Sequence, residues 1–271
     1  MTRSITVPVD WYRQSLRSLG PASVMAAQMG LSLKLISIVP SEDLVAVREG
    51  DLRGVLHEHD LDAELAVLPD TSPANRLVEY ARVNAGDLMC MSTHARGAVT
   101  EAVMGSVAFR VLRESGRPLV MVGPDQAPDW GPRVQTLLVC LDGSSFAESI
   151  LEPTAALAVE LGARISLVQV FDTATDRPPP GQDSAEWVYL RRMAGALERD
   201  HGIQADWETL HGKDPGRALV DYAGQTPGSL LAMTTHGRTG ASRALMGSVA
   251  QRACRHSPVP LLLHCPEGAA A

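Results

Sequence analysis

One pattern occurs twice in this chain at a constant separation, and that repetition limits what the chain can fold into. Ser92-Thr93-His94-Ala95 is followed, after nine residues, by Gly105-Ser106-Val107-Ala108. Thr234-Thr235-His236-Gly237 is followed, after nine residues, by Gly247-Ser248-Val249-Ala250. The two copies lie 142 residues apart, and each has a methionine before its Gly-Ser and a proline-led apolar run after it. This conserved order indicates an internal duplication and predicts two similar domains in tandem.

Length and composition agree with two domains. The 271 residues, 45% of them hydrophobic, are enough for two domains that each bury a core. We place the domains at residues 1–125 and 133–271, with Gly123–Pro132 as a linker rich in proline and glycine. The net charge of −7 and the 4% aromatic content argue against nucleic acid as the main partner. We find neither a membrane-length apolar run nor a cleavable signal, so a cytoplasmic protein is expected.

Each half has the pattern of five strands separated by helical segments. Strands that alternate with helices predict a parallel sheet with helices on both faces. The apolar fifth strands are expected to pair edge to edge, which would make the two halves an intrachain pseudo-dimer. The expected strands are Ser4–Val9, Leu33–Val39, Ala63–Leu68, Asp87–Met91 and Pro118–Val122, then Thr136–Leu141, Ile165–Phe171, Gln204–Leu210, Ser229–Met233 and Pro260–Leu263.

The candidate site lies where strands one and four end. Asp10 and Asp142 follow the first strand of each half, and the repeated loop follows the fourth. Parallel sheets of this class bind ligands outside the carboxyl ends of their strands, where the strand order reverses. Glycine before a helix start lets the backbone approach an anion with its first amides exposed. The alternatives are a surface loop with a serine cap and an aspartate that only forms a turn.

The chain resembles a tandem universal stress protein, a family with the loop signature Gly-x2-Gly-x9-Gly-Ser. The resemblance covers nearly all of both halves and is most specific at Leu141–Ser145, Leu157–Ala163 and Thr235–Val249. It implies two doubly wound α/β domains, each with a five-stranded parallel sheet in the order 3-2-1-4-5. Members with the signature bind ATP, and many form dimers. The resemblance therefore implies ATP, alone or with Mg²⁺, a homodimer and a role in the stress response.

The resemblance also implies which residues hold the nucleotide. Asp142 and the backbone near Val170 would hold adenine. Thr234, Gly237 and Gly247 would approach ribose and phosphates through their backbone, with Ser248 and Val249 on phosphate. The other candidates are Gly143, His236 and Arg238 in the second domain, and Asp10, Ile38, Ser92, His94, Gly105, Ser106 and Val107 in the first.

The two halves depart from the signature to different extents. In the second half, Thr234 stands in place of the first glycine. In the first half, Ser92 and Ala95 replace the first and second glycines, and Trp11-Tyr12 replaces the Gly-Ser after the aspartate. An alanine at positive φ costs about 1 kcal/mol that glycine avoids, and Trp11 would fill the crevice or stack on a base. We therefore expect the second domain to be the binding domain.

Three functions remain open from the sequence. The first is an ATP-binding regulatory protein, and the second is a slow ATP hydrolase. The third is a dimerisation module whose sites have decayed. The absence of a P-loop lysine, and of a convincing general base or metal cluster near the loop, disfavours the hydrolase. His236 is interpreted as a loop anchor rather than a phosphate ligand, Arg238 as either a phosphate ligand or a solvated side chain, and His57–Asp60 as a solvated helix end.

Overall fold

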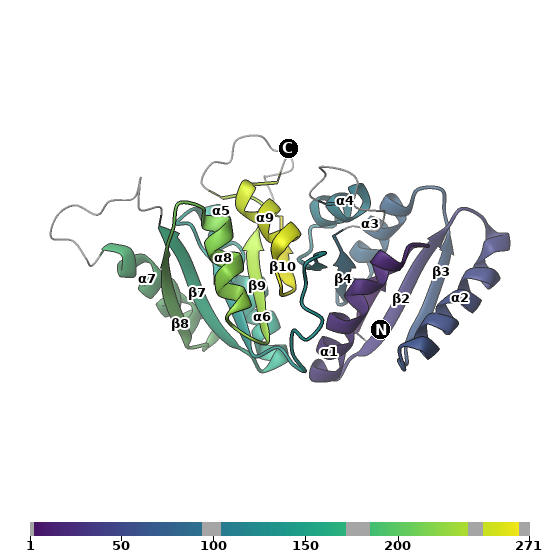
Figure 1. The fold of residues 1–271 in the computed structure, drawn as a ribbon, viewed down its shortest axis with the longest axis horizontal. Helices are drawn as coiled ribbons and strands as arrows, with labels where there is room; N and C mark the ends of the chain where they lie inside the picture. Colours follow the sequence, from purple (N-terminus) through teal and green to yellow (C-terminus); the bar gives the residue numbers. More distant parts are fainter. Residues whose placement is uncertain (1–2, 94–103, 172–184, 238–245, 266–271) are drawn as a thin grey trace.

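A computed structural model describes residues 3–93, 104–171, 185–237 and 246–265 of the chain. The described strands form one continuous sheet in the order β3-β2-β1-β4-β5-β10-β9-β6-β7-β8 (Figure 1). Each half therefore has the order 3-2-1-4-5, which confirms the predicted doubly wound α/β fold. The strands are β1 Ser4–Pro8, β2 Ser32–Val39, β3 Glu64–Pro69, β4 Leu88–Ser92, β5 Leu119–Val122, β6 Thr136–Cys140, β7 Arg164–Phe171, β8 Ala205–His211, β9 Ser229–Thr234 and β10 Leu261–His264.

Helices cover both faces of the sheet. In the second domain, α8 and α9 lie on one face and α6 and α7 on the other (Figure 1). The helices are η1 Arg13–Ser18, α1 Leu19–Met29, η2 Glu42–Leu44, α2 Val45–Glu58, α3 Pro73–Val83, α4 Ser106–Glu114, α5 Ser145–Glu148, α6 Leu151–Leu161, α7 Ala185–His201, α8 Pro215–Gly224 and α9 Ser248–His256.

Helix starts and stops follow the repeated signals in the sequence. Pro21 and Pro153 lie in the first turns of α1 and α6, where a missing amide hydrogen is tolerated. Gly30 and Gly162 end these helices in the left-handed conformation, with φ of 64° and 58°. The long helical segment expected after each first strand is divided in two, into η1 and α1 in the first domain and α5 and α6 in the second.

The two domains join through their fifth strands, as the apolar runs predicted. β10 pairs with β5 in antiparallel register, with Leu261 opposite Met121 and Leu263 opposite Leu119. The other strand pairs of the described sheet are parallel. Every residue of β5 and β6 is buried, as expected for strands covered on both faces. The hydrophobic core therefore continues through the domain boundary.

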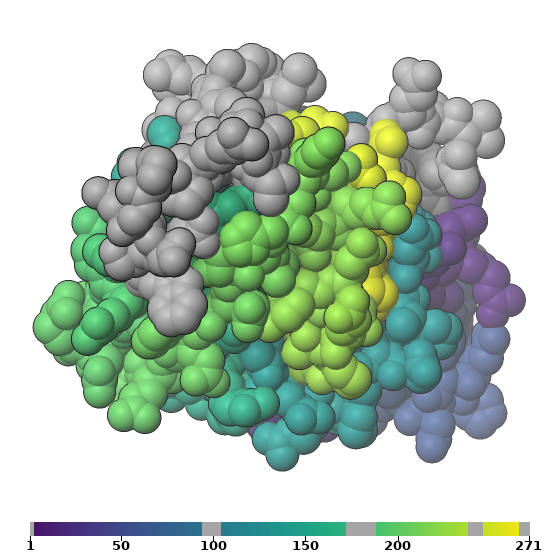
Figure 2. Space-filling view, turned by 60° about the vertical axis from the view of Figure 1, so that its left-hand side comes forward, coloured from purple at the N-terminus to yellow at the C-terminus, as the bar shows by residue number. Residues whose placement is uncertain are grey.

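The linker segment packs against the second domain. Trp130 is 5% exposed, and its indole nitrogen donates to the carbonyl oxygen of Ser229 at 2.5 Å. The amide of Ala127 donates to the carbonyl oxygen of Pro258 at 2.9 Å. On α1, the Gln28 side chain accepts from the amide of Val134 at 2.8 Å and donates to the carbonyl oxygen of Val134 at 2.8 Å. In the space-filling view, the yellow surface from near the end of the chain adjoins teal surface from its middle (Figure 2).

Candidate functional site

A cavity of about 250 Å³ opens at the carboxyl ends of β6 and β9 in the second domain. Its volume is near the lower end of the usual range for small-molecule sites, roughly 300–1,000 Å³. It lies at the place where the strand order reverses, as the fold class predicts. Its lining residues are Cys140, Leu141, Asp142, Ala147, Val168, Val170, Pro215, Leu219, Met233, Thr234, Thr235, His236, Gly237, Gly247, Ser248, Val249 and Ala250.

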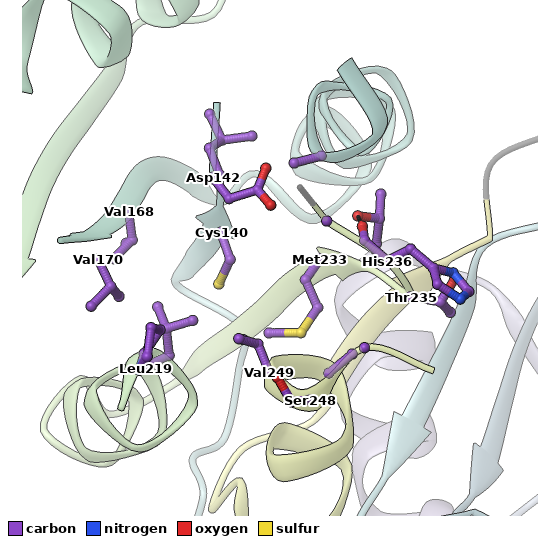
Figure 3. Close-up of a pocket in the computed structure, with 17 residues that line it drawn as sticks. Cys140, Asp142, Val168, Val170, Leu219, Met233, Thr235, His236, Ser248 and Val249 are labelled. Carbon is purple, nitrogen blue, oxygen red and sulfur yellow. Dashed lines mark hydrogen bonds between the residues drawn. The ribbon is translucent and has the colours of Figure 1, made fainter. Parts of the chain in front are cut away.

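One side of the cavity is an apolar slot. Val168 and Val170 of β7 contribute to it together because alternate residues of a strand share a face. Leu219 of α8 lies across from the end of β7, and Cys140 of β6 lies between this side and Met233 (Figure 3). Aliphatic walls of this kind suit the faces of a flat ring, whose polar edge is then left to backbone groups.

The N-terminus of α9 forms another part of the cavity. Its N-cap is Gly247 in extended conformation, and no side chain caps the helix. The amide of Gly247 donates to the carbonyl oxygen of Thr235 at 2.8 Å, which fixes the helix start beside the end of β9. The neighbouring α8 is different, because Asp214 caps it by accepting from the amide of Arg217 at 3.0 Å. The first-turn amides of α9 and its positive dipole end therefore favour an anion.

Asp142 lies opposite, and its carboxylate is held against the repeated loop. Its Oδ1 accepts from the amide of Ser144 at 2.9 Å and from the Ser144 hydroxyl at 2.6 Å. A Cβ atom built on Gly237 would lie 2.1 Å from Oδ2 of Asp142, far inside van der Waals contact. A side chain at position 237 would therefore require the Asp142 carboxylate or the loop backbone to shift.

The residues between β9 and the loop hydrogen-bond mainly to one another. The Thr234 hydroxyl donates to the carbonyl oxygen of His236 at 2.6 Å. The Thr235 hydroxyl lies 2.9 Å from Nδ1 of His236, and the Thr235 amide donates to the carbonyl oxygen of His264 on β10 at 2.9 Å. These contacts agree with the interpretation of His236 as a loop anchor. The Thr234 hydroxyl, at the position of the first glycine of the signature, thus bonds to the backbone two residues further on.

The cavity gathers most of the second-domain candidates from the sequence. Gly143 is not among the lining residues, and Arg238 lies outside the described residues, as does His94 of the first domain. The apolar slot was missed, although Val168 stands two residues before the candidate Val170 and an alternating strand pattern implies both. The cavity-lining residues that sequence reasoning did not select are Cys140, Leu141, Ala147, Val168, Pro215, Leu219, Met233, Thr235 and Ala250.

In the first domain two of the equivalent backbone contacts are kept. Gly105 caps α4 in the same extended conformation, and its amide donates to the carbonyl oxygen of Thr93 at 2.7 Å. Oδ1 of Asp10 accepts from the amide of Tyr12 at 2.8 Å, as Oδ1 of Asp142 accepts from the amide of Ser144. Trp11 is 49% exposed and lies over the buried guanidinium of Arg48, 4.5 Å from its ring centroid.

The remaining first-domain candidates keep the positions that the repeat assigns to them. Ile38 is half-buried near the end of β2, and Ser92 is buried at the end of β4. Ser106 and Val107 form the first turn of α4, as Ser248 and Val249 do in α9. About half of the Trp11 surface faces solvent, and its ring packs against the Arg48 guanidinium.

Cys140 brings a thiol to the cavity wall, and burial raises its pKa well above the ordinary value. The other three cysteines are also buried, and burial raises the pKa of Cys254 to about 12. Because the thiolate is the reactive form, we expect no fast reaction of the native protein with Ellman's reagent at neutral pH. All four thiols should react after unfolding in guanidinium. A rapidly labelled thiol in the native protein would contradict this burial.

Comparison with known proteins agrees with this architecture. The sequence profile of the universal stress protein family matches residues 1–123 and 133–264. A universal stress protein of Mycobacterium tuberculosis is 25% identical over 199 residues, covering 71% of this chain and 66% of the relative. A universal stress protein from Mycolicibacterium smegmatis is 22% identical over 236 residues, covering 85% of this chain and 76% of that protein. The chain thus spans about two thirds of the length of the first of these relatives.

Solved structures show the same fold. The crystal structure of a universal stress protein from Archaeoglobus fulgidus has a TM-score of 0.65 and 18% identity, covering 99% of this chain and all of that one. The chain is a tandem α/β protein of two doubly wound domains, and the second domain has a cavity where its strand order reverses. The chain belongs to the universal stress protein family, with two family domains in tandem. None of the described helices is long and apolar enough to cross a membrane.

Proposed function

We propose that the second domain binds an adenine nucleotide, with ATP as the expected ligand. The observation that carries the proposal is the side-chain-free start of α9 at Gly247, which opens into a cavity with an apolar slot beside it. One ligand that needs both features is a flat apolar ring joined to a phosphate group.

The proposed arrangement follows from the walls of the cavity. The base lies between the valines of β7 and Leu219, and its polar edge meets the backbone near Val170. The phosphates lie at the first-turn amides of Ser248 and Val249, where the helix dipole favours negative charge. Asp142 is placed to accept hydrogen bonds from the nucleoside. Mg²⁺, where present, would contact the phosphates.

We further propose a regulatory role, in a cytoplasmic stress-response protein that forms homodimers. A bound nucleotide would act by stabilising the start of α9 against the end of β9, and with it the contacts made at the carboxyl ends of these strands. Hydrolysis is not needed for such a role.

Mass spectrometry of material released by heat denaturation tests the ligand directly, and an adenine nucleotide is the expected result. Titration calorimetry with ATP, with Mg²⁺ and with EDTA, then measures affinity and the contribution of the metal. The proposal would be contradicted if no nucleotide co-purified with the protein and added ATP did not bind to it.

Ser248→Asp should weaken ATP binding at least 10-fold while leaving the fold intact. A carboxylate at the first position of α9 repels phosphate but interacts favourably with the helix dipole, so the helix itself is not weakened. Ser106→Asp makes the same change at the start of α4 and serves as the matched control. If Ser248→Asp bound ATP as tightly as the parent protein, the phosphates could not lie at the start of α9.

A further inference from the structure

The crevice of the first domain is bridged by hydrogen bonds that the second domain does not have. In the repeat, Ser15 is equivalent to Ala147 and Ser92 to Thr234, and both second-domain residues line the cavity. In the first domain these two positions bond directly, because the Ser92 hydroxyl donates to the carbonyl oxygen of Ser15 at 3.1 Å. The helical segment after β1 and the end of β4 are thus hydrogen-bonded to each other in the first domain.

Ser15 and its neighbour Ser18 hold this bridge in place from η1. The Ser15 hydroxyl donates to the carbonyl oxygen of Tyr12 at 2.7 Å and accepts from the amide of Asp10 at 3.2 Å. The Ser18 hydroxyl donates to the carbonyl oxygen of Ser15 at 3.1 Å. Ser15 is 3% exposed and Ser18 is fully buried, so these bonds lie in the protein interior. Their chain runs from the end of β1 to the end of β4.

The cause lies in the two residues after the aspartate. In the second domain, Gly143 has a φ of +87°, and Ser144 caps α5 by accepting from the amide of Ala147 at 3.2 Å. Trp11 is not among the described residues with positive φ, and Tyr12 offers no side-chain cap to η1. The backbone therefore differs between Trp11 and Gly143, and in the first domain the Ser15 carbonyl oxygen lies within hydrogen-bond distance of the Ser92 hydroxyl on β4.

The second domain keeps its crevice open with the same elements. Ala147 has no hydroxyl with which to bridge, and the Thr234 hydroxyl donates to the carbonyl oxygen of His236 in its own loop. The Ser144 hydroxyl is bound to Asp142. The hydroxyls of Thr234 and Ser144 thus bond to groups on their own side of the crevice. Neither bridges the space in which a ligand would lie.

We infer that η1 closes the first-domain crevice from within, so that this domain takes no nucleotide. The inference rests on the proposed function, and together they predict that each chain binds one nucleotide. The first domain then supports the second structurally, through the pairing of β5 with β10 and the hydrogen bonds of Gln28 to Val134. The second domain provides the nucleotide site.

Calorimetry with ATP on the full chain tests the inference by its stoichiometry. One site per chain is expected, with its affinity at least 10-fold weaker in Ser248→Asp and unchanged in Ser106→Asp. Two sites per chain, or a single site that Ser106→Asp removes, would overturn the inference while leaving nucleotide binding by the protein established.

A chain that binds no ATP would refute the proposed function, and closure by η1 is then decided by thermal unfolding. Ser15→Ala should lower the Tm by a few degrees, because it removes a buried hydroxyl and leaves the partly buried amide of Asp10 without its acceptor. Ser145→Ala, an exposed serine at the start of α5, should leave the Tm unchanged. Equal Tm values for Ser15→Ala and the parent protein would mean that this cluster does not hold η1.

Discussion

Gly237→Val should weaken ATP binding by about 10- to 100-fold and leave the chain folded. The first atom of the new side chain would fall 2.1 Å from Oδ2 of Asp142, so either the carboxylate or the loop must move. Overpacking of this kind costs about 1–3 kcal/mol, and in the site it displaces two of the groups assigned to the nucleotide. Gly237 is only partly buried and lies outside the hydrophobic core, so global stability should change much less.

A double-mutant cycle separates this contact from other effects of the substitution. Gly237→Ala alone should reduce affinity, while Gly237→Ala combined with Asp142→Ala should lose less than the sum of the two single changes. Calorimetry measures affinity, and circular dichroism checks the fold. Additive losses would show that the carboxylate contact is not the cause, and native affinity in Gly237→Val would refute the site assignment.

Much of the fold was predictable because the pattern of each strand and helix occurs twice in the sequence. Apolar runs gave the strands, and the apolar ends of the halves predicted the pairing of β5 with β10. Gly30 and Gly162 were correctly interpreted as helix ends because glycine adopts the left-handed conformation at low cost. These signals are local, so the sequence carries them directly.

The difference between the two crevices was only partly predictable. The replacement of Gly-Ser by Trp11-Tyr12 indicated a change, and the sequence suggested that the indole would fill the crevice or stack on a base. In the structure Trp11 lies over Arg48, and the carbonyl oxygen of Ser15 accepts from the Ser92 hydroxyl. Which group closes a space depends on long-range packing between η1 and β4, and no periodic pattern encodes that contact.

The linker illustrates the same limit. Its prolines and glycines predicted a connection between domains, and composition does not reveal that Trp130 is buried. The indole nitrogen donates to the carbonyl oxygen of Ser229, at the start of β9, and the carbonyl oxygen of Trp130 accepts from the amide of Gly228 at 3.1 Å. The strand that leads to the candidate site is therefore anchored at its other end by the linker.

Trp130→Ala should destabilise the chain by about 3–5 kcal/mol, the range for truncation of a buried aromatic side chain. The change leaves a cavity under the linker and removes the donor to the buried carbonyl of Ser229. Trp207→Ala is the matched control, because Trp207 on the edge strand β8 is 41% exposed and its loss should cost much less. Urea unfolding followed by circular dichroism measures both. Similar unfolding midpoints for the two variants would mean that the linker is a passive tether, and the second domain would then hold β9 without help from the segment that joins it to the first.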